Sequence, residues 1–217
     1  MWLHNNLPLK ERGGRLYSVQ LDEKEIPGIE ALGVQNFKSV LEVPEPIHYA
    51  LVAVPRQVSP YVLKDLIAAG AGGAGFFTSG FAETGEELGI RLQEQLASMA
   101  REAGFNLVGP NCMGLYLPKA GVRFNVDAPV TDAGEIGFLS QSGTHGIMFS
   151  LVAAANGMYI SKCASFGNAI VLDVSDYLEY LMLDDETKVI GMYVEGVKDG
   201  RRFFATLKEA CRRKPVV

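Results

Sequence analysis

The residues best suited to chemistry lie in short loops that follow predicted strands. One of these loops, Ser140–Gly146 (SQSGTHG), joins hydroxyl side chains to a glycine at the predicted start of a helix. Free backbone N–H groups and the positive end of the helix dipole favour an anion at such a place. The loop therefore predicts a phosphate site. In the alternative interpretation, Ser142 or Thr144 only caps the helix.

Two further loops carry side chains that could act on a ligand. In Gly109–Gly114 (GPNCMG), a turn could present Asn111 and Cys112 to a ligand, or could bury Cys112 as a small apolar residue. Glu195 ends the apolar stretch VIGMYVEG and could either orient an imidazole or cap the next helix. The residues alone leave both pairs of alternatives open.

The three histidines carry weaker signals. His145 follows the hydroxyl residues and could be a nucleophile or a phosphate ligand, but it lies one turn into the predicted helix and could equally face solvent. His4 and His48 belong to no pattern, so we expect structural or exposed roles for both.

Short apolar segments alternate with segments of helical period, which predicts parallel sheets covered by helices. The predicted strands are Arg15–Leu21, Tyr49–Val54, Ala74–Thr78, Asn106–Val108, Ile136–Leu139, Ile160–Ser165 and Val189–Val194. The predicted helices are Ser59–Ala69, Glu86–Ala103, Gly143–Asn156, Ser175–Leu183 and Gly200–Arg213, and Pro215–Val217 is expected to begin another strand.

The segment Pro118–Gly134 interrupts this alternation with prolines, aspartates and glycines. We therefore expect two consecutive α/β domains, at residues 1–127 and 128–217. In open parallel sheets, ligands bind beyond the carboxyl ends of the strands, which is where the loops described above lie.

Composition narrows the class of protein. The chain has 217 residues, 48% of them hydrophobic and 21% charged, which is typical of a folded globular chain. A net charge of −5 argues against nucleic-acid or membrane binding as the main task. Three cysteines without CxxC spacing indicate neither a disulfide framework nor a zinc site, so no metal site is expected. With no signal-like start, we expect a cytoplasmic location.

Taken in order, the motifs VPR, TSGFAETG, GPNCMGLYLP, GFLSQSGTHG, SFGNA and YVEGVKDGRRF resemble the NDP-forming acyl-CoA synthetases, which are relatives of the succinyl-CoA synthetase α subunit. The resemblance spans nearly the whole chain. It implies a Rossmann-like CoA-binding domain followed by a flavodoxin-like ligase domain. It also implies the reaction acyl-CoA + ADP + phosphate ⇌ carboxylic acid + CoA + ATP, through an acyl phosphate and a phosphohistidine.

The resemblance assigns expected roles to particular positions. It implies a CoA site lined by Val19, Val54, Pro55, Thr78, Ser79 and Gly80, with Asn111, Cys112 and Met113 where the thioester meets the acyl group. It further implies that Ser142, Gly143 and Thr144 hold the phosphate and that Glu195 hydrogen-bonds the active histidine.

The chain also departs from the family pattern. Family members open with a strand and a glycine-rich turn that cradles the CoA phosphates, and Met1–Gly14 resembles neither. Val19-Gln20-Leu21 stands where the family usually has Val-Asn-Pro. The phosphorylated histidine normally follows the KPVV strand, and no histidine of this chain matches its motif. We therefore expect both domains to be incomplete and CoA binding by this chain to be weak.

The resemblance implies CoA as a substrate, and ATP or ADP with Mg²⁺ bound mainly outside this chain. The implied partners are acyl-CoA, phosphate and a β subunit or fused ATP-grasp domain, in an oligomer. The alternative function is a regulatory module that senses CoA or acyl-CoA, for example in a synthetase-like protein acyltransferase. A dehydrogenase is a weaker alternative because no GxGxxG follows the first predicted strand.

Overall fold

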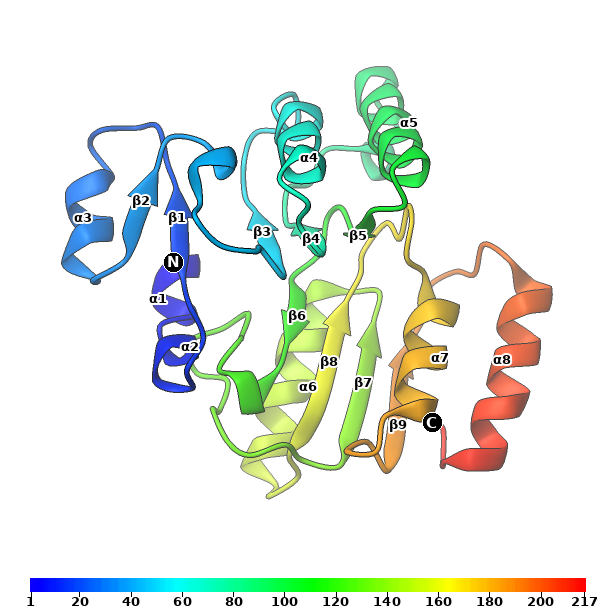
Figure 1. Ribbon diagram of the computed structural model, residues 1–217. Helices are drawn as coiled ribbons and strands as arrows, with labels where there is room; N and C mark the ends of the chain where they lie inside the picture. The colour runs from blue at the N-terminus through cyan, green and yellow to red at the C-terminus, as the bar shows by residue number, and fades with distance from the viewer.

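Nine strands form three separate sheets in the computed structural model, which describes all 217 residues (Figure 1). The strand orders are β1-β2, β3-β4-β5 and β6-β8-β7-β9. The strands are β1 (Tyr17–Val19), β2 (Gln35–Phe37), β3 (Ala50–Val52), β4 (Gly73–Phe76), β5 (Asn106–Val108), β6 (Gly114–Tyr116), β7 (Ile136–Ser140), β8 (Ile160–Ser165) and β9 (Val189–Tyr193).

Eight α-helices accompany the strands, and three short 3₁₀ turns lie at 40–42, 82–84 and 118–120. The helices are α1 (Trp2–Asn5), α2 (Pro8–Glu11), α3 (Ile26–Ala31), α4 (Ser59–Ala68), α5 (Glu87–Glu102), α6 (Gly143–Ala155), α7 (Val174–Leu183) and α8 (Gly200–Arg213). No helix is both long enough and apolar enough to span a membrane.

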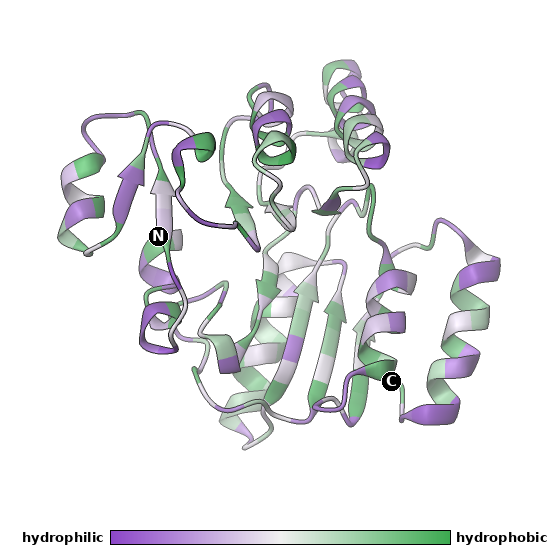
Figure 2. Ribbon diagram, viewed as in Figure 1, coloured by the Kyte–Doolittle hydropathy of each residue, from purple (hydrophilic) through white to green (hydrophobic).

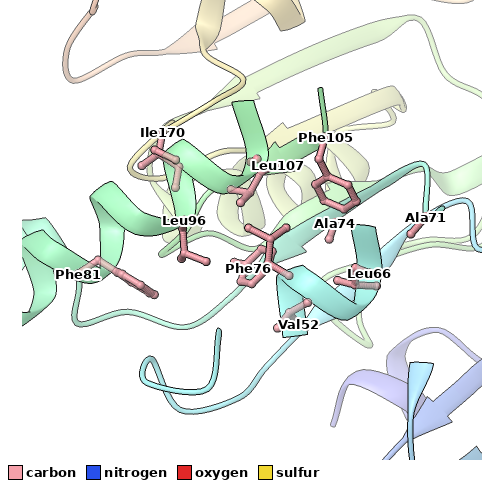
Figure 3. Packing of buried hydrophobic residues seen from close by; sticks show 13 residues of the cluster. Val52, Leu66, Ala71, Ala74, Phe76, Phe81, Leu96, Phe105, Leu107 and Ile170 are labelled. Atoms are coloured by element: carbon pink, nitrogen blue, oxygen red, sulfur yellow. The ribbon is translucent and has the colours of Figure 1, made fainter. Parts of the chain in front are cut away.

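The first α/β unit is built on the parallel sheet β3-β4-β5. Its core joins the sheet to α4 and α5, with Phe76, Leu66 and Leu96 almost fully buried among the side chains of Figure 3. All four residues of β4 are buried, as expected for the central strand of a covered parallel sheet. This packing fixes the loops that leave the carboxyl ends of the three strands.

The second unit has helices on both faces of its sheet. Leu139, Ala164 and Ile190 belong to a core cluster with α7 and α8, whereas the neighbouring residues Phe138 and Cys163 belong to a cluster with α6. This division follows from the alternation of side chains along a strand. Figure 2 shows apolar residues along these strands and along α6, while hydrophilic residues mark α8.

The α/β class with parallel sheets is confirmed, and the predicted helices and longer strands form within a few residues of their expected bounds. The main difference is β6, which was not predicted. It pairs antiparallel with β8, so Gly114–Tyr116 belong to the second sheet although they precede the expected border at 127/128. The border itself remains a prediction.

Two other parts of the chain add detail. Helix α3 and strand β2 were not predicted, and Met1–Gly14 forms the short helices α1 and α2. At the other end, Pro215–Val217 pairs in parallel with β9: the Ile190 N–H donates to Pro215 O at 2.9 Å and the Met192 N–H to Val217 O at 2.8 Å. The expected strand-like pairing of this segment is therefore present.

Candidate functional site

A single loop, Gly109–Met113, joins the two sheets at the carboxyl ends of their strands. The loop leaves β5 and delivers the chain to β6, whose first residue, Gly114, lies opposite Ser165 at the end of β8. Cys112 Sγ contacts the carbonyl oxygen of Phe76, the last residue of β4, at 3.5 Å. The ends of β4, β5, β7 and β8 therefore meet around this loop, because Ser140 of β7 also pairs with Ser165.

Hydrogen bonds link three of the predicted CoA-site positions in the first unit. Thr78 Oγ1 donates to the carbonyl oxygen of Val54, across the ends of β3 and β4. The Asn111 N–H donates to the carbonyl oxygen of Thr78 at 3.0 Å. Pro55 and Ser79 lie beside these residues and are exposed. The structure therefore gathers Val54, Thr78 and Asn111 at one edge of the sheet.

Arg56 is a further residue of this edge that the sequence analysis did not select. Its guanidinium donates to the carbonyl oxygen of Gly80 and pairs with Glu86 at 2.6 Å. Its side chain is 21% exposed, so part of the positive charge is reachable from solvent. The VPR motif contains this arginine, and a cation next to an expected phosphate-bearing ligand was the signal that could have identified it.

Val19 stands apart from the other predicted CoA-site residues. It ends β1, which pairs only with β2, and no strand pairing joins that sheet to β3. Val19 as a whole residue is 47% exposed. The structure thus leaves Val19 available to a ligand but does not bring it against Val54 or Thr78 by backbone pairing.

Cys112 is buried, in line with the apolar alternative for its side chain. It is 4% exposed, and Sγ faces the carbonyl oxygens of Phe76 and Val108. Burial raises the pKa of the thiol to about 12, so the thiolate is not formed near neutral pH. Any contact of Cys112 with a ligand would come from its backbone.

Met113 connects the CoA-side loop to the start of α6. Its N–H donates to Ser165 Oγ at 3.1 Å. A Cβ atom built on Gly143, the first residue of α6, would lie 3.0 Å from Met113 Cγ, closer than side chains normally approach. Glycine at 143 thus allows Met113 to rest against the helix start, which brings two predicted sites together.

The start of α6 has the features of an anion site. Ser142 is the N-cap, and its Oγ accepts from the His145 N–H at 3.4 Å. Ser140 Oγ donates to the carbonyl oxygen of Ser142 at 2.6 Å, which fixes the cap. The first N–H groups of a helix have no partner within the helix, so those of Gly143 and Thr144 are free to donate to an anion. Ser142 therefore caps the helix, as in the alternative interpretation, and the free N–H groups of Gly143 and Thr144 are present at the same helix start.

His145 lies on the exposed side of α6 and stacks on Tyr193, with ring centroids 4.1 Å apart and an angle of 12°. This stacking gives the ring an aromatic partner at the end of β9.

Glu195 is held next to the helix start by Gln141, another residue that the sequence analysis did not select. Gln141 Oε1 accepts from the Glu195 N–H at 2.7 Å and from the Gly196 N–H at 3.0 Å. The side chain of Glu195 is exposed. Gln141 is the central residue of the SQS motif, and its position between two hydroxyl residues was the available signal.

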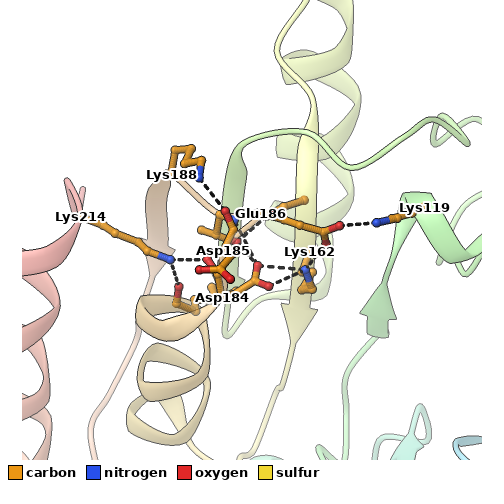
Figure 4. Close-up of polar contacts among 10 residues, drawn as sticks. Lys119, Lys162, Asp184, Asp185, Glu186, Lys188 and Lys214 are labelled. Carbon is orange, nitrogen blue, oxygen red and sulfur yellow. Dashed lines mark hydrogen bonds and ion pairs between the residues drawn. The ribbon is translucent and has the colours of Figure 1, made fainter.

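A second polar cluster lies at the opposite end of the second sheet (Figure 4). Lys162 pairs with Asp184 at 2.9 Å and with Glu186 at 2.6 Å, and Glu186 also pairs with Lys119 at 2.6 Å. Its contacts are ion pairs between β8, the α7–β9 turn and the segment after β6, which is a structural arrangement. No group of three or more His, Cys, Asp or Glu side chains is placed to hold a metal ion.

The two units, joined by the loop Gly109–Met113, define a two-domain α/β protein, and comparison with known proteins identifies the family of each domain. Residues 7–118 match the family of CoA binding domains, and residues 133–217 match the succinyl-CoA ligase like flavodoxin domain. The chain therefore belongs to the CoA-binding domain family, and its second domain is the succinyl-CoA ligase like flavodoxin domain. Its resemblance to the NDP-forming acyl-CoA synthetases is confirmed.

Similar proteins include ADP-forming ligases. The chain is 38% identical over 209 residues to acetate–CoA ligase (ADP-forming) I of Archaeoglobus fulgidus, covering 96% of this chain and 30% of that protein. It is 36% identical over 210 residues to the α subunit of acetate–CoA ligase (ADP-forming) II of Pyrococcus furiosus, covering 96% of this chain and 44% of the subunit. The chain thus spans less than half of these relatives.

Among solved structures, one of the most similar is a dinucleotide-forming acetyl-coenzyme A synthetase 1 of Ca. Korarchaeum cryptofilum in complex with phosphate and ADP. The TM-score is 0.87 at 30% identity, over 99% of this chain and 45% of that one. The relatives do not favour the alternative of a regulatory module.

Proposed function

We propose that this chain supplies the CoA and phosphate sites of an NDP-forming acyl-CoA synthetase, which catalyses acyl-CoA + ADP + phosphate ⇌ carboxylic acid + CoA + ATP. One observation carries the proposal: the loop Gly109–Met113 lies between the two sheets and rests, through Met113, on the start of α6. A thioester held at this loop would lie next to a phosphate held at the helix start. The names of the similar proteins support the same reaction.

In this proposal the CoA molecule lies along the carboxyl edge of β3 and β4. The CoA molecule is lined by Val54, Pro55, Thr78, Ser79 and Gly80. Val19 contacts the part of CoA farthest from the thioester, and Arg56 adds positive charge. Asn111 and Met113, with the backbone of Cys112, contact the thioester end. Because the nucleophilic sulfur belongs to CoA, the buried Cys112 thiol takes no covalent part.

The phosphate binds at Ser142, Gly143 and Thr144, whose hydroxyl and N–H groups match its oxygens. Glu195 follows β9, the strand next to β7, at the carboxyl edge of the second sheet. An active histidine at this edge would have to reach both the phosphate site and the thioester site. A carboxylate that accepts from one imidazole nitrogen leaves the other free to carry the phosphoryl group. We propose that a segment outside these residues provides the histidine.

The remaining partners follow from the same reaction. A β subunit or fused ATP-grasp domain would bind ADP or ATP, and the Mg²⁺ that accompanies the nucleotide would bind there as well. CoA, ADP and phosphate are water-soluble reactants, so we propose a cytoplasmic enzyme. We also propose that it works as an oligomer, which the α-subunit relatives support. The acid is specified only as a carboxylic acid.

The test uses a polypeptide that joins these residues to the further domains of its relatives. Incubated with acyl-CoA and phosphate, it should form an acid-labile phosphohistidine, and Glu195→Gln should reduce the yield at least about tenfold because the imidazole loses its orienting partner. Glu30→Gln, a carboxylate change at an exposed position of α3, is the control. Absence of phosphohistidine in the unchanged protein would contradict the proposal.

A further inference from the structure

We propose that Asn168 is a positioning residue that couples the two units, because its side-chain amide, which belongs to the second unit, bonds to the loops that leave β4 and β5 of the first unit. Asn168 lies in the loop between β8 and α7, in the second unit. Its Nδ2 donates to Glu83 Oε2 at 2.6 Å and to Gln93 Oε1 at 2.9 Å. Its Oδ1 accepts from Asn111 Nδ2 at 3.4 Å. That CoA is the ligand so positioned rests on the proposed function.

The hydrogen bonds continue through Glu83 into the first unit. Glu83 Oε1 accepts from the Gly80 N–H at 2.6 Å, and both carboxylate oxygens accept from the Phe81 N–H, at 3.1 and 3.2 Å. Gly80 has a φ of 94°, which other residues rarely adopt. The carboxylate therefore determines how the backbone turns at Gly80, and Asn168 determines where the carboxylate lies.

Asn168 can transmit position because its own loop is fixed. Its N–H donates to the carbonyl oxygen of Pro110 at 3.0 Å, and the Ile170 N–H donates to Gly109 at 3.0 Å. Ala169, with a φ of 51°, is held by Lys198, whose Nζ donates to its carbonyl oxygen. A backbone tied so closely to the Gly109–Met113 loop leaves the amide of Asn168 as a rigid link to Glu83.

The charge of Glu83 is consistent with this role. Partial burial opposes ionisation, but hydrogen bonds from Asn168 and from the backbone N–H groups of Gly80 and Phe81 outweigh it and lower the pKa of Glu83. The carboxylate is thus ionised near neutral pH and attracts the donors. Replacing the amide donor by an acceptor should therefore reverse the interaction.

The geometry allows a test by exchange of donor and acceptor. Asn168→Asp places two carboxylates in contact and so breaks the link. Glu83→Gln removes the charge that attracts the donors and, with the Asn168 amide in its present orientation, sets an amide donor against an amide donor, so it weakens the link. In the double variant, the amide at position 83 can donate to the carboxylate at 168 while its oxygen still accepts from Gly80. Gln95→Glu, an exposed change on α5, controls for added negative charge.

Two measurements on the 217-residue chain separate the coupling from the proposed function. Amide hydrogen exchange at Gly80 and Phe81 should be about tenfold faster in each single variant, and within about threefold of the unchanged chain in the double variant. CoA affinity measured by calorimetry should fall about tenfold in each single variant and recover in the double. Gln95→Glu should change neither.

The outcomes are distinct. The coupling would be overturned if the exchange rates at Gly80 and Phe81 stay unchanged in the single variants. It would also be overturned if the exchange rate in the double variant rises by the combined effect of the two single changes. Both conclusions hold whether or not CoA binds. If exchange follows the predicted pattern but the unchanged chain does not bind CoA, the coupling stands and the proposed ligand falls. If Glu83 and Asn168 acted only through the general stability of the fold, the destabilising effects of the two substitutions would add. The double variant would then not restore the exchange rate.

Discussion

Ser165 Oγ accepts a hydrogen bond from the Met113 N–H at 3.1 Å, and through it the last residue of β8 holds the loop that arrives from the first unit. Ser165 is fully buried. Hence the N–H of Met113 has a partner only as long as the two units keep this arrangement.

Removing the hydroxyl should weaken the junction. Ser165→Ala leaves the Met113 N–H without its partner, and we expect the free energy of unfolding to fall by about 1–2 kcal/mol, measured in urea. Ser98→Ala, at an exposed position of α5, should leave it within about 0.5 kcal/mol. Equal stability of the two variants would show that the bond contributes nothing to the junction.

Gly143 at the start of α6 should affect the affinity for CoA and not the formation of the helix. Gly143→Ala forces Met113 to move, because the new Cβ would lie 3.0 Å from Met113 Cγ, and we expect CoA affinity to fall about fivefold. Gly200→Ala is the matched control: Gly200 is likewise the first residue of its helix, and a Cβ there meets nothing within 4 Å. An affinity change of the same size in both variants would refute the steric explanation.

The ion pair at the far end of the second sheet should contribute a pH-dependent stability. Partial burial opposes ionisation of Asp184, but hydrogen bonds from Thr187 and Lys162 outweigh it and lower its pKa. A carboxylate whose folded-state pKa is depressed stabilises the fold above its ordinary pKa of about 4. That contribution is lost as the pH falls through the lower, folded-state value.

We therefore expect the free energy of unfolding to decline below about pH 4, and the decline to be smaller in Asp184→Asn. At pH 7, Lys162→Met should cost about 2 kcal/mol, since it leaves a carboxylate with 12% exposure without its cation. Urea unfolding between pH 2.5 and 7 measures both effects. An Asp184→Asn variant with the same pH dependence as the unchanged chain would rule out this origin.

Cysteine reactivity should distinguish the three thiols. Cys112 and Cys163 are buried, and burial raises the pKa of both, whereas Cys211 is exposed. One thiol per chain should therefore react quickly with a disulfide reagent in the native state, and three should react after unfolding. Rapid reaction of more than one thiol in the folded chain would contradict the buried position of Cys112.

The elements with strong periodic signals were predictable from the sequence. Strand β8 and helix α8 have the predicted bounds, because long apolar or amphipathic segments with a clear cap determine their own structure. Asp199 illustrates this, since its side chain accepts from the N–H groups of Arg201 and Arg202 at the start of α8.

Strand β6 and helix α3 were not predictable in the same way. β6 is three residues long and begins with glycine, so only its pairing with β8 makes it a strand. In α3, Pro27 and Gly28 weaken the local helical signal. Tertiary contacts determine both elements.

The meeting of the candidate loops was predictable, because loops at the carboxyl ends of parallel strands lie at one edge of a sheet. The contacts between these loops were not. Glu83 and Asn168 are 85 residues apart, and Gln141 meets Glu195 across 54 residues. No local pattern encodes such pairs, and the burial of Cys112 likewise depends on β4 and β5, which pack around it.

Binding of CoA at the loops that leave β3, β4 and β5 can be tested by titrating the 217-residue chain with CoA and following its backbone amide resonances by NMR. Weak, saturable shifts are expected at Thr78–Gly80 and Asn111–Met113, and none in the turn at 184–188. An absence of shifts at millimolar CoA, or shifts confined to residues away from the loops at the carboxyl ends of β3, β4 and β5, would contradict binding at these loops.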